Sequence, residues 1–203
     1  MGQLDLLSQL DTFSQLNIFS MEMIKEYMGE LFDEKEKERW DQELSGIYCK
    51  EYMESRMQVL DRACIAPVAV IYFNINDSKF VLDHFGKEQG DSLVRFVASA
   101  IRQEAQGEYV VGRMDKDVFL VLIPLAEQGE AEVYCRRIQE VCLAYDGDDI
   151  PAPSVASGIG YKTNVEECLQ EKLSDAEYEM LKNKLEMKQE PGYEQRLRRP
   201  LGN

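Results

Sequence analysis

Short apolar runs, separated by stretches in which apolar positions recur at helical spacing, predict a sheet covered by helices. Residues 67–73 (PVAVIYF) are apolar, β-branched and aromatic, which is typical of a buried central strand. Residues 109–112 and 118–123 are two more such runs, and the polar stretch 113–117 between them indicates a β-hairpin. Residues 154–161 predict a further strand.

Three segments predict helices that cover this sheet. Residues 91–104 carry Leu93, Val97 and Ile101 at helical spacing, and residues 130–145 and 165–188 continue the alternation of strands and helices. The order of elements predicts an α/β or α+β fold, in which helices flank a central sheet of about five strands.

The first 43 residues predict a separate helical segment. Positions spaced alternately four and three apart form a heptad-like seam, namely Leu10, Ser14, Asn17, Met21, Ile24, Met28 and Leu31. The seam favours self-association through a coiled coil, and the alternative is an amphipathic helix that packs on its own domain. Residues 44–188 then form the main domain, and residues 189–203 form a loose basic tail.

Charge narrows the class of partner. The chain has 23 Lys and Arg against 38 Asp and Glu, a net charge of −15, which repels nucleic acid and anionic membrane surfaces. There is no run of about 18 apolar residues and no basic, hydrophobic leader, so a cytoplasmic protein is expected. Five scattered cysteines and one histidine lack the spacing of a zinc site, so free thiols are expected.

Polar residues at the end of the first strand are the main candidates for chemistry. Asn74, Asn76 and Asp77 follow the apolar run directly, and the hairpin carries Asp115 and Asp117. Carboxylates and amides gathered at a strand end are the donors that a metal–nucleotide site uses.

In five fragments, in the right order, residues 44–187 resemble the GGDEF domain of bacterial diguanylate cyclases. The fragments are residues 44–47 (LSGI), 74–91 (NINDSKFVLDHFGKEQGD), 113–119 (RMDKDVF) and 154–158 (SVASG), and Ser174 and Asp175 with Lys182. In the family, residues 113–119 read Arg-Tyr-Gly-Gly-Asp-Glu-Phe. The resemblance implies a palm-like α+β fold with a mostly antiparallel sheet and a role in cyclic di-GMP signalling.

The residues that would carry catalysis depart from the family pattern. The family's metal positions fall on Asn74, Ile75 and Asp117, and the degenerate hairpin positions are Asp115, Lys116, Asp117 and Val118. Asn is a weaker metal ligand than Asp, and Val118 replaces an acid with a side chain that cannot take a proton. Asp115 and Lys116 replace two glycines that let the hairpin approach the triphosphate. We expect no catalytic residue here and no cofactor, with Mg²⁺ bound only if a nucleotide still binds.

The nucleotide-binding positions are only partly kept. The candidates are Lys79, Leu82, Asp91 and Lys182. Leu82 and Asp91 fall on the pair that reads guanine, where the family has Asn and Asp, and Lys182 falls on a phosphate-binding lysine. Asp91 also has a simpler interpretation as an N-cap or first-turn acid, because it follows Gly90 at the expected start of a helix. The family's inhibitory product site, Arg-x-x-Asp, falls on Gln106 and Tyr109 and is expected to be absent.

Together these departures predict a catalytically inactive signalling module that acts through a protein partner or self-association. One alternative is a sensor that holds GTP or cyclic di-GMP without turnover, through Lys79, Asp91, Asp117 and Lys182. Another is a divergent diguanylate cyclase that converts GTP to cyclic di-GMP at a relocated metal site, formed by Asp77, Asp115 and Asp117.

Overall fold

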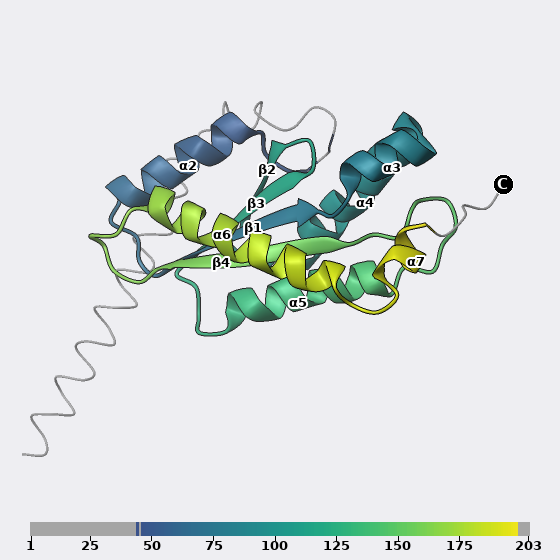
Figure 1. Cartoon of the computed structure of the whole chain (residues 1–203). Helices are drawn as coiled ribbons and strands as arrows, with labels where there is room; N and C mark the ends of the chain where they lie inside the picture. The colour runs from purple at the N-terminus through teal and green to yellow at the C-terminus, as the bar shows by residue number, and fades with distance from the viewer. Residues whose placement is uncertain (1–43, 45, 199–203) are drawn as a thin grey trace, which may run out of the picture. The chain divides into compact units, whose positions relative to one another are not determined.

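A four-stranded antiparallel sheet in the order β2-β3-β1-β4 forms the centre of the computed structural model, which describes residue 44 and residues 46–198 (Figure 1). The strands are β1 (Val68–Ile75), β2 (Val110–Asp115), β3 (Val118–Pro124) and β4 (Val155–Lys162). The predicted α+β class and antiparallel sheet are confirmed. The sequence predicts about five strands; in the described residues there are four, with an isolated bridge between Tyr48 and Gly112 at the β2 edge.

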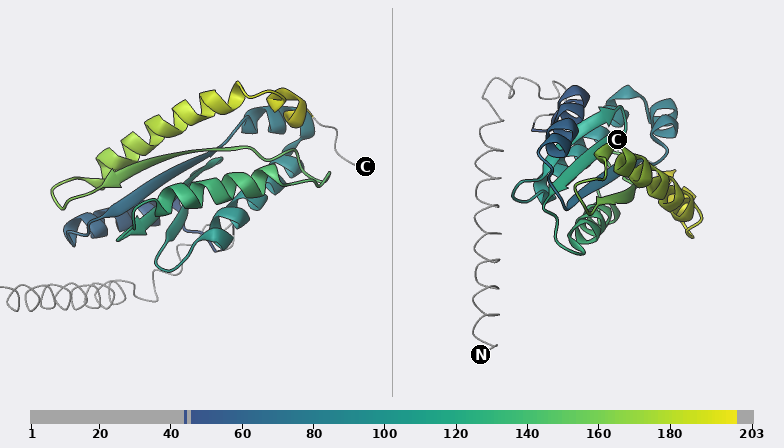
Figure 2. Two further views of the ribbon diagram at one scale, coloured as in Figure 1. Left: turned by 90° about the horizontal axis from the view of Figure 1, so that it is seen from below. Right: turned by 90° about the vertical axis from the view of Figure 1, so that its left-hand side faces the viewer.

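Helices cover both faces of this sheet (Figure 2). They are α2 (Lys50–Arg62), α3 (Ser78–Phe85), α4 (Lys87–Glu104), α5 (Glu130–Leu143), α6 (Leu169–Lys188) and α7 (Tyr193–Leu197). α4 and α5 lie on one face, and α6 lies across β4 and β1 on the other. Among the described residues, none of these helices combines the length and apolar character needed to cross a membrane.

The central strand β1 is buried on both faces because it lies between β3 and β4 and beneath both helical layers. Side chains alternate along a strand, so Ile71, Phe73 and Ile75 join the core cluster under α4 and α5. Asn74 falls on the opposite face, toward α6. An amide is thereby placed in an otherwise apolar strand, on the side that α6 covers.

Two glycines of β4 allow α6 to lie directly on the strand. A Cβ at Gly158 would be 2.1 Å from the Ala176 carbonyl oxygen and 2.2 Å from the Met180 nitrogen. A Cβ at Gly160 would be 2.1 Å from the Lys172 carbonyl oxygen. Backbone atoms of a helix cannot move aside as a flexible side chain can, so this close approach requires glycine at both positions.

The start of α6 is held by a carboxylate from α2. Asp61 accepts a hydrogen bond from the fully buried Lys162 ammonium at 2.5 Å and another from the Leu169 backbone N–H at 3.1 Å. One carboxylate thus neutralises a buried cation and satisfies a donor at the helix N-terminus. This contact ties α2, β4 and α6 together.

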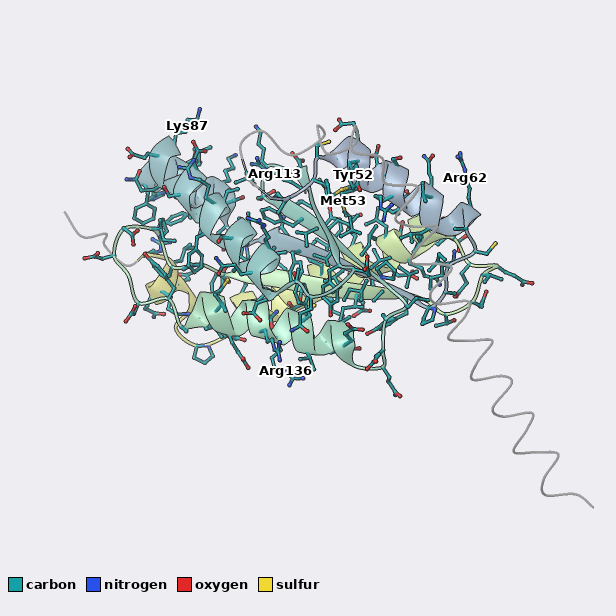
Figure 3. All side chains as sticks on the ribbon, turned by 180° about the vertical axis from the view of Figure 1, so that it is seen from behind. Tyr52, Met53, Arg62, Lys87, Arg113 and Arg136 are labelled. Atoms are coloured by element: carbon teal, nitrogen blue, oxygen red, sulfur yellow. The ribbon has the colours of Figure 1, made fainter. Side chains whose placement is uncertain are left out.

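Helices α2 and α3 are absent from the predicted elements. α2 packs on the edge strand, where its Met53, labelled in Figure 3, fills the space over Gly112. Its buried face includes Arg56, and a charged residue among apolar ones hides the helical period. α3 is only eight residues long, and Val81 is its one buried residue.

The C-terminal segment 189–203, predicted to be a loose tail, contains a docked helix. Tyr193 of α7 is buried, and its hydroxyl donates to an Asp77 carboxylate oxygen at 2.7 Å. The predicted helical seam between Leu10 and Leu31 lies outside the described residues, as do residues 199–203.

The close packing of α6 on β4 predicts that Gly158→Ala is strongly destabilising. We expect a loss of about 3 kcal/mol in the free energy of unfolding, because the new methyl group meets helix backbone. Urea denaturation followed by circular dichroism measures this loss. Gly90→Ala in α4 is the matched control, since its Cβ meets nothing closer than 3.8 Å and should be neutral or stabilising by up to about 1 kcal/mol. Equal stability of the two variants would contradict the packing described.

Glu167, in the loop between β4 and α6, is expected to make a pH-dependent contribution to the stability of the fold. The Lys172 ammonium, followed by backbone N–H groups of Thr163 and Asn164, lowers the pKa of this carboxyl from 4.5 to about 2. A carboxyl group whose pKa is lower in the folded state than in the unfolded state stabilises the fold at pH values above its unfolded-state pKa. This contribution is lost as the pH falls through the folded-state pKa. Glu167→Gln should therefore melt below the wild type at neutral pH, with a gap that closes between pH 4.5 and about 2. A gap in melting temperature that is constant with pH would contradict this.

Candidate functional site

The end of β1 and the start of β3 bring the predicted metal positions together. Asn74 pairs with Val118 across the two strands, and the Ile75 backbone N–H donates to the Asp117 carbonyl oxygen at 2.9 Å. Antiparallel pairing forces this proximity, because the hairpin turn lies beside the end of β1. Asn74, Ile75 and Asp117 are therefore neighbours, as the resemblance implies.

The polar side chains at these positions already have partners. The Lys184 ammonium, from α6, donates to Asn74 Oδ1 at 2.5 Å, and Asn74 is only 8% exposed. The Ser78 hydroxyl donates to Asp117 Oδ2. Mg²⁺ takes oxygen ligands in an octahedral shell and favours carboxylates. A neutral amide oxygen engaged by an ammonium group does not fit that requirement.

The turn that follows β1 is held by the C-terminal part of the chain. Asp77, in a left-handed conformation with φ 53°, accepts hydrogen bonds from Lys188 at 2.6 Å and Tyr193 at 2.7 Å. Burial alone would raise the pKa of Asp77, but these two hydrogen bonds outweigh it and the pKa is lowered. Asp77 is thus an ionised partner of Lys188.

The relocated metal site of the third hypothesis does not assemble in the described part of the chain. Asp77 is turned to Lys188 and Tyr193, while Asp115 Oδ1 accepts the Lys116 backbone N–H within the hairpin turn at 2.7 Å. No group of three or more His, Cys, Asp or Glu side chains suited to a metal occurs among the residues described.

A cleft of about 850 Å³ opens beside the hairpin, between α3, α4 and β2. Lys79, Leu82 and Asp91 all line it, so three of the four predicted nucleotide-binding residues are brought together. Its basic residues are Lys50, Lys79, Lys87, Arg113 and Lys116, and its acidic residues are Glu51, Asp91, Asp115 and Asp117. Figure 3 labels Lys87 and Arg113, which come from α4 and β2. The cleft is therefore slightly basic in a strongly acidic chain.

The interpretation of Asp91 as an N-cap or first-turn acid is wrong. α4 begins at Lys87, after Gly86 with φ 89°, so Asp91 lies in the second turn rather than at the N-terminus. It is exposed and faces the cleft. The sequence places the start of this helix too late, at residue 91, because residues 87–90 carry no apolar side chain to mark the first turn.

The fourth predicted residue, Lys182, lies elsewhere. It is exposed, pairs with Glu179 at 3.3 Å and lines a separate pocket between β4, α5 and α6. Lys184, two residues on, faces the strand end instead. A signal for this was present in the sequence, since Ala176, Met180, Lys184 and Lys188 are spaced by four and share one helix face.

The residues at the positions of the family's product site form hydrogen bonds with neighbouring parts of the fold. Gln106 and Tyr109 are joined through the backbone at 3.1 Å, and the Tyr109 hydroxyl donates to Glu130 at 2.7 Å. Burial, followed by this carboxylate, raises the pKa of Tyr109. The neutral Tyr109 phenol, paired with Glu130, does not supply the carboxylate that the family's product site uses to bind its ligand.

Comparison with known proteins agrees with this geometry. Residues 41–190 match the family described as "Diguanylate cyclase, GGDEF domain". The diguanylate cyclase SiaD from Pseudomonas aeruginosa, solved in complex with its activator SiaC, has a TM-score of 0.67 at 17% identity, over 90% of this chain and 70% of SiaD. The FimX GGDEF domain from the same organism has a TM-score of 0.66 at 14% identity, over 73% and 94% of the two chains. These likenesses show the fold.

A curated relative covers less of the chain. The cyclic di-GMP phosphodiesterase NbdA of Pseudomonas aeruginosa is 27% identical over 104 residues. These residues are 50% of this chain and 13% of NbdA, so the chain spans a small part of that relative's length.

Proposed function

Because the chain belongs to the GGDEF domain family, we propose that it is a catalytically inactive member that works in cyclic di-GMP signalling through protein contacts. The observation that carries this proposal is the hydrogen bond from Lys184 to Asn74, at the strand end where the resemblance implies a metal ligand. Val118 lies directly across from Asn74 and is buried, at the position of the family's acid.

The magnitudes favour an inactive site. A positioned general acid or base contributes about 10²–10⁴ in rate, and a metal ion contributes several kcal/mol of transition-state stabilisation. Val118 supplies neither function, and Asn74 is held by an ammonium group. In addition, Asp115 and Lys116 add side chains where glycine would let backbone approach phosphates.

An apolar stripe on α6 supports the part of the proposal that concerns protein contacts. Tyr178, Leu181 and Leu185 are 67%, 50% and 63% exposed, and their spacing places them along one side of the helix. A cluster of large exposed apolar side chains is typical of an interaction surface. Self-association through the Leu10 to Leu31 seam is a second route to protein contact and stays a prediction.

The proposal predicts that the purified protein forms no cyclic di-GMP from GTP and Mg²⁺. The measurement is product detection by chromatography, with heat-denatured protein as the blank and an active diguanylate cyclase as the positive control. We expect a rate equal to the blank, because the acid and the metal ligand are both replaced. Product formed well above the blank would refute inactivity and favour the divergent cyclase.

A second candidate is a nucleotide sensor without turnover. The cleft favours it, because five basic side chains, against four acidic ones, line a cavity that also offers an apolar wall, formed by Val81, Leu82 and Val94. Apolar surface with a few charged groups is the usual composition of a small-ligand site. This hypothesis rests on Lys79, Asp91 and Asp117, which line the cleft, since Lys182 lies in another pocket.

Calorimetry with GTP, ATP and cyclic di-GMP, with and without Mg²⁺, separates the two candidates. The interaction module predicts no heat of binding, whereas the sensor predicts binding without product. If a nucleotide binds, Lys79→Ala should weaken it about tenfold through loss of a charged contact. Lys182→Ala is the control and should leave the affinity unchanged. The cleft is not the nucleotide site if the two variants bind alike.

A further inference from the structure

Lys184 occupies an unusual place for a lysine. It lies near the C-terminal end of α6, on the row of residues that starts with Ala176 and Met180 against β4. Its side chain is partly buried, and its Nζ reaches Asn74 Oδ1, which belongs to a strand buried on both faces. A lysine usually extends to solvent, so this inward position calls for a compensating interaction.

The amide oxygen of Asn74 and two nearby carboxylates provide part of that compensation. Burial, followed by the neighbouring Lys188, lowers the pKa of the Lys184 ammonium, and Asp117 and Asp77 offset part of this shift. Lys188 is itself neutralised at 2.6 Å by Asp77, which also accepts from Tyr193. Asp117, which the Ser78 hydroxyl holds in place, is therefore the nearby carboxylate not neutralised by Lys188, and its charge favours the Lys184 ammonium.

From this arrangement we infer that the Lys184 ammonium replaces the divalent cation at the end of β1, so that the site carries its own cation and excludes metal. The inference rests on the proposed function, for which it supplies the structural cause. A site with two carboxylates and a divalent cation is neutral. Here Asn74 removes one negative charge and Lys184 in place of the metal removes one positive charge, so the site is neutral again.

Geometry as well as charge excludes the metal. A divalent cation would need the same Asn74 oxygen that the ammonium binds at 2.5 Å, and would lie against a fixed positive charge. The backbone that carries Lys184 is fixed, because α6 is seated on Gly158 and Gly160 through backbone contacts. Because the ammonium group is part of the chain, its presence at the end of β1 does not depend on the concentration of an ion in solution.

The test is a titration with Mn²⁺, followed by the electron paramagnetic resonance signal of the free ion. The Asn74→Asp/Lys184→Met double variant restores a carboxylate and removes the cation. It should bind Mn²⁺ at least about 10-fold more tightly than the wild type. Lys182→Met removes a lysine from the exposed side of the same helix and should bind like the wild type, which controls for the acidic surface. Equal affinity of the double variant and the wild type would overturn the inference.

A measurement on the wild type covers the case in which the double variant does not fold. The side-chain amide signal of Asn74 in ¹H–¹⁵N NMR should stay sharp as Mn²⁺ is added, because the paramagnetic ion does not approach it. Selective broadening of this signal would overturn the inference. Such a result would leave the proposed inactivity standing, since that depends on cyclic di-GMP formation and would fail only if product appeared.

Discussion

The approach of α6 to β4 is the constraint on which the candidate site depends. Gly158 and Gly160 leave no room for a side chain, so the helix backbone rests on the strand. Asp61 fixes the start of the helix through the Leu169 N–H. With position and rotation both set, the residue two turns beyond Ala176 must be the one that reaches the end of β1, and that residue is Lys184.

Two lysines of α6 lie at the end of β1, where the family pattern implies a metal centre. Lys184 donates to Asn74, while Lys188 and Tyr193 hold Asp77 at the start of α3. Asp77 neutralises Lys188 directly, whereas Lys184 has an amide oxygen as its partner. The family pattern has aspartate at position 74, and here the amide in its place accepts the hydrogen bond of the Lys184 ammonium.

Much of the fold could be predicted from the sequence, and the parts that could not have identifiable causes. The apolar run at 67–73 and the hairpin were clear because β-branched residues mark buried strands. α2 was missed because Arg56 interrupts its apolar face. At the site, motif order correctly brought Asn74 and Asp117 together, but it selected Lys182 over Lys184. Which lysine faces inward depends on the rotation of α6 on β4, which only the packing of the two elements determines.

The central claim is that an ammonium group occupies the cation position, and crystals soaked in Mn²⁺ test it most directly. Anomalous diffraction recorded at the manganese edge locates any bound ion. The account predicts no anomalous peak beside Asn74 Oδ1, with Lys184 Nζ within hydrogen-bonding distance of that oxygen. A manganese peak between Asn74 and Asp117, with the Lys184 side chain turned away, would contradict it.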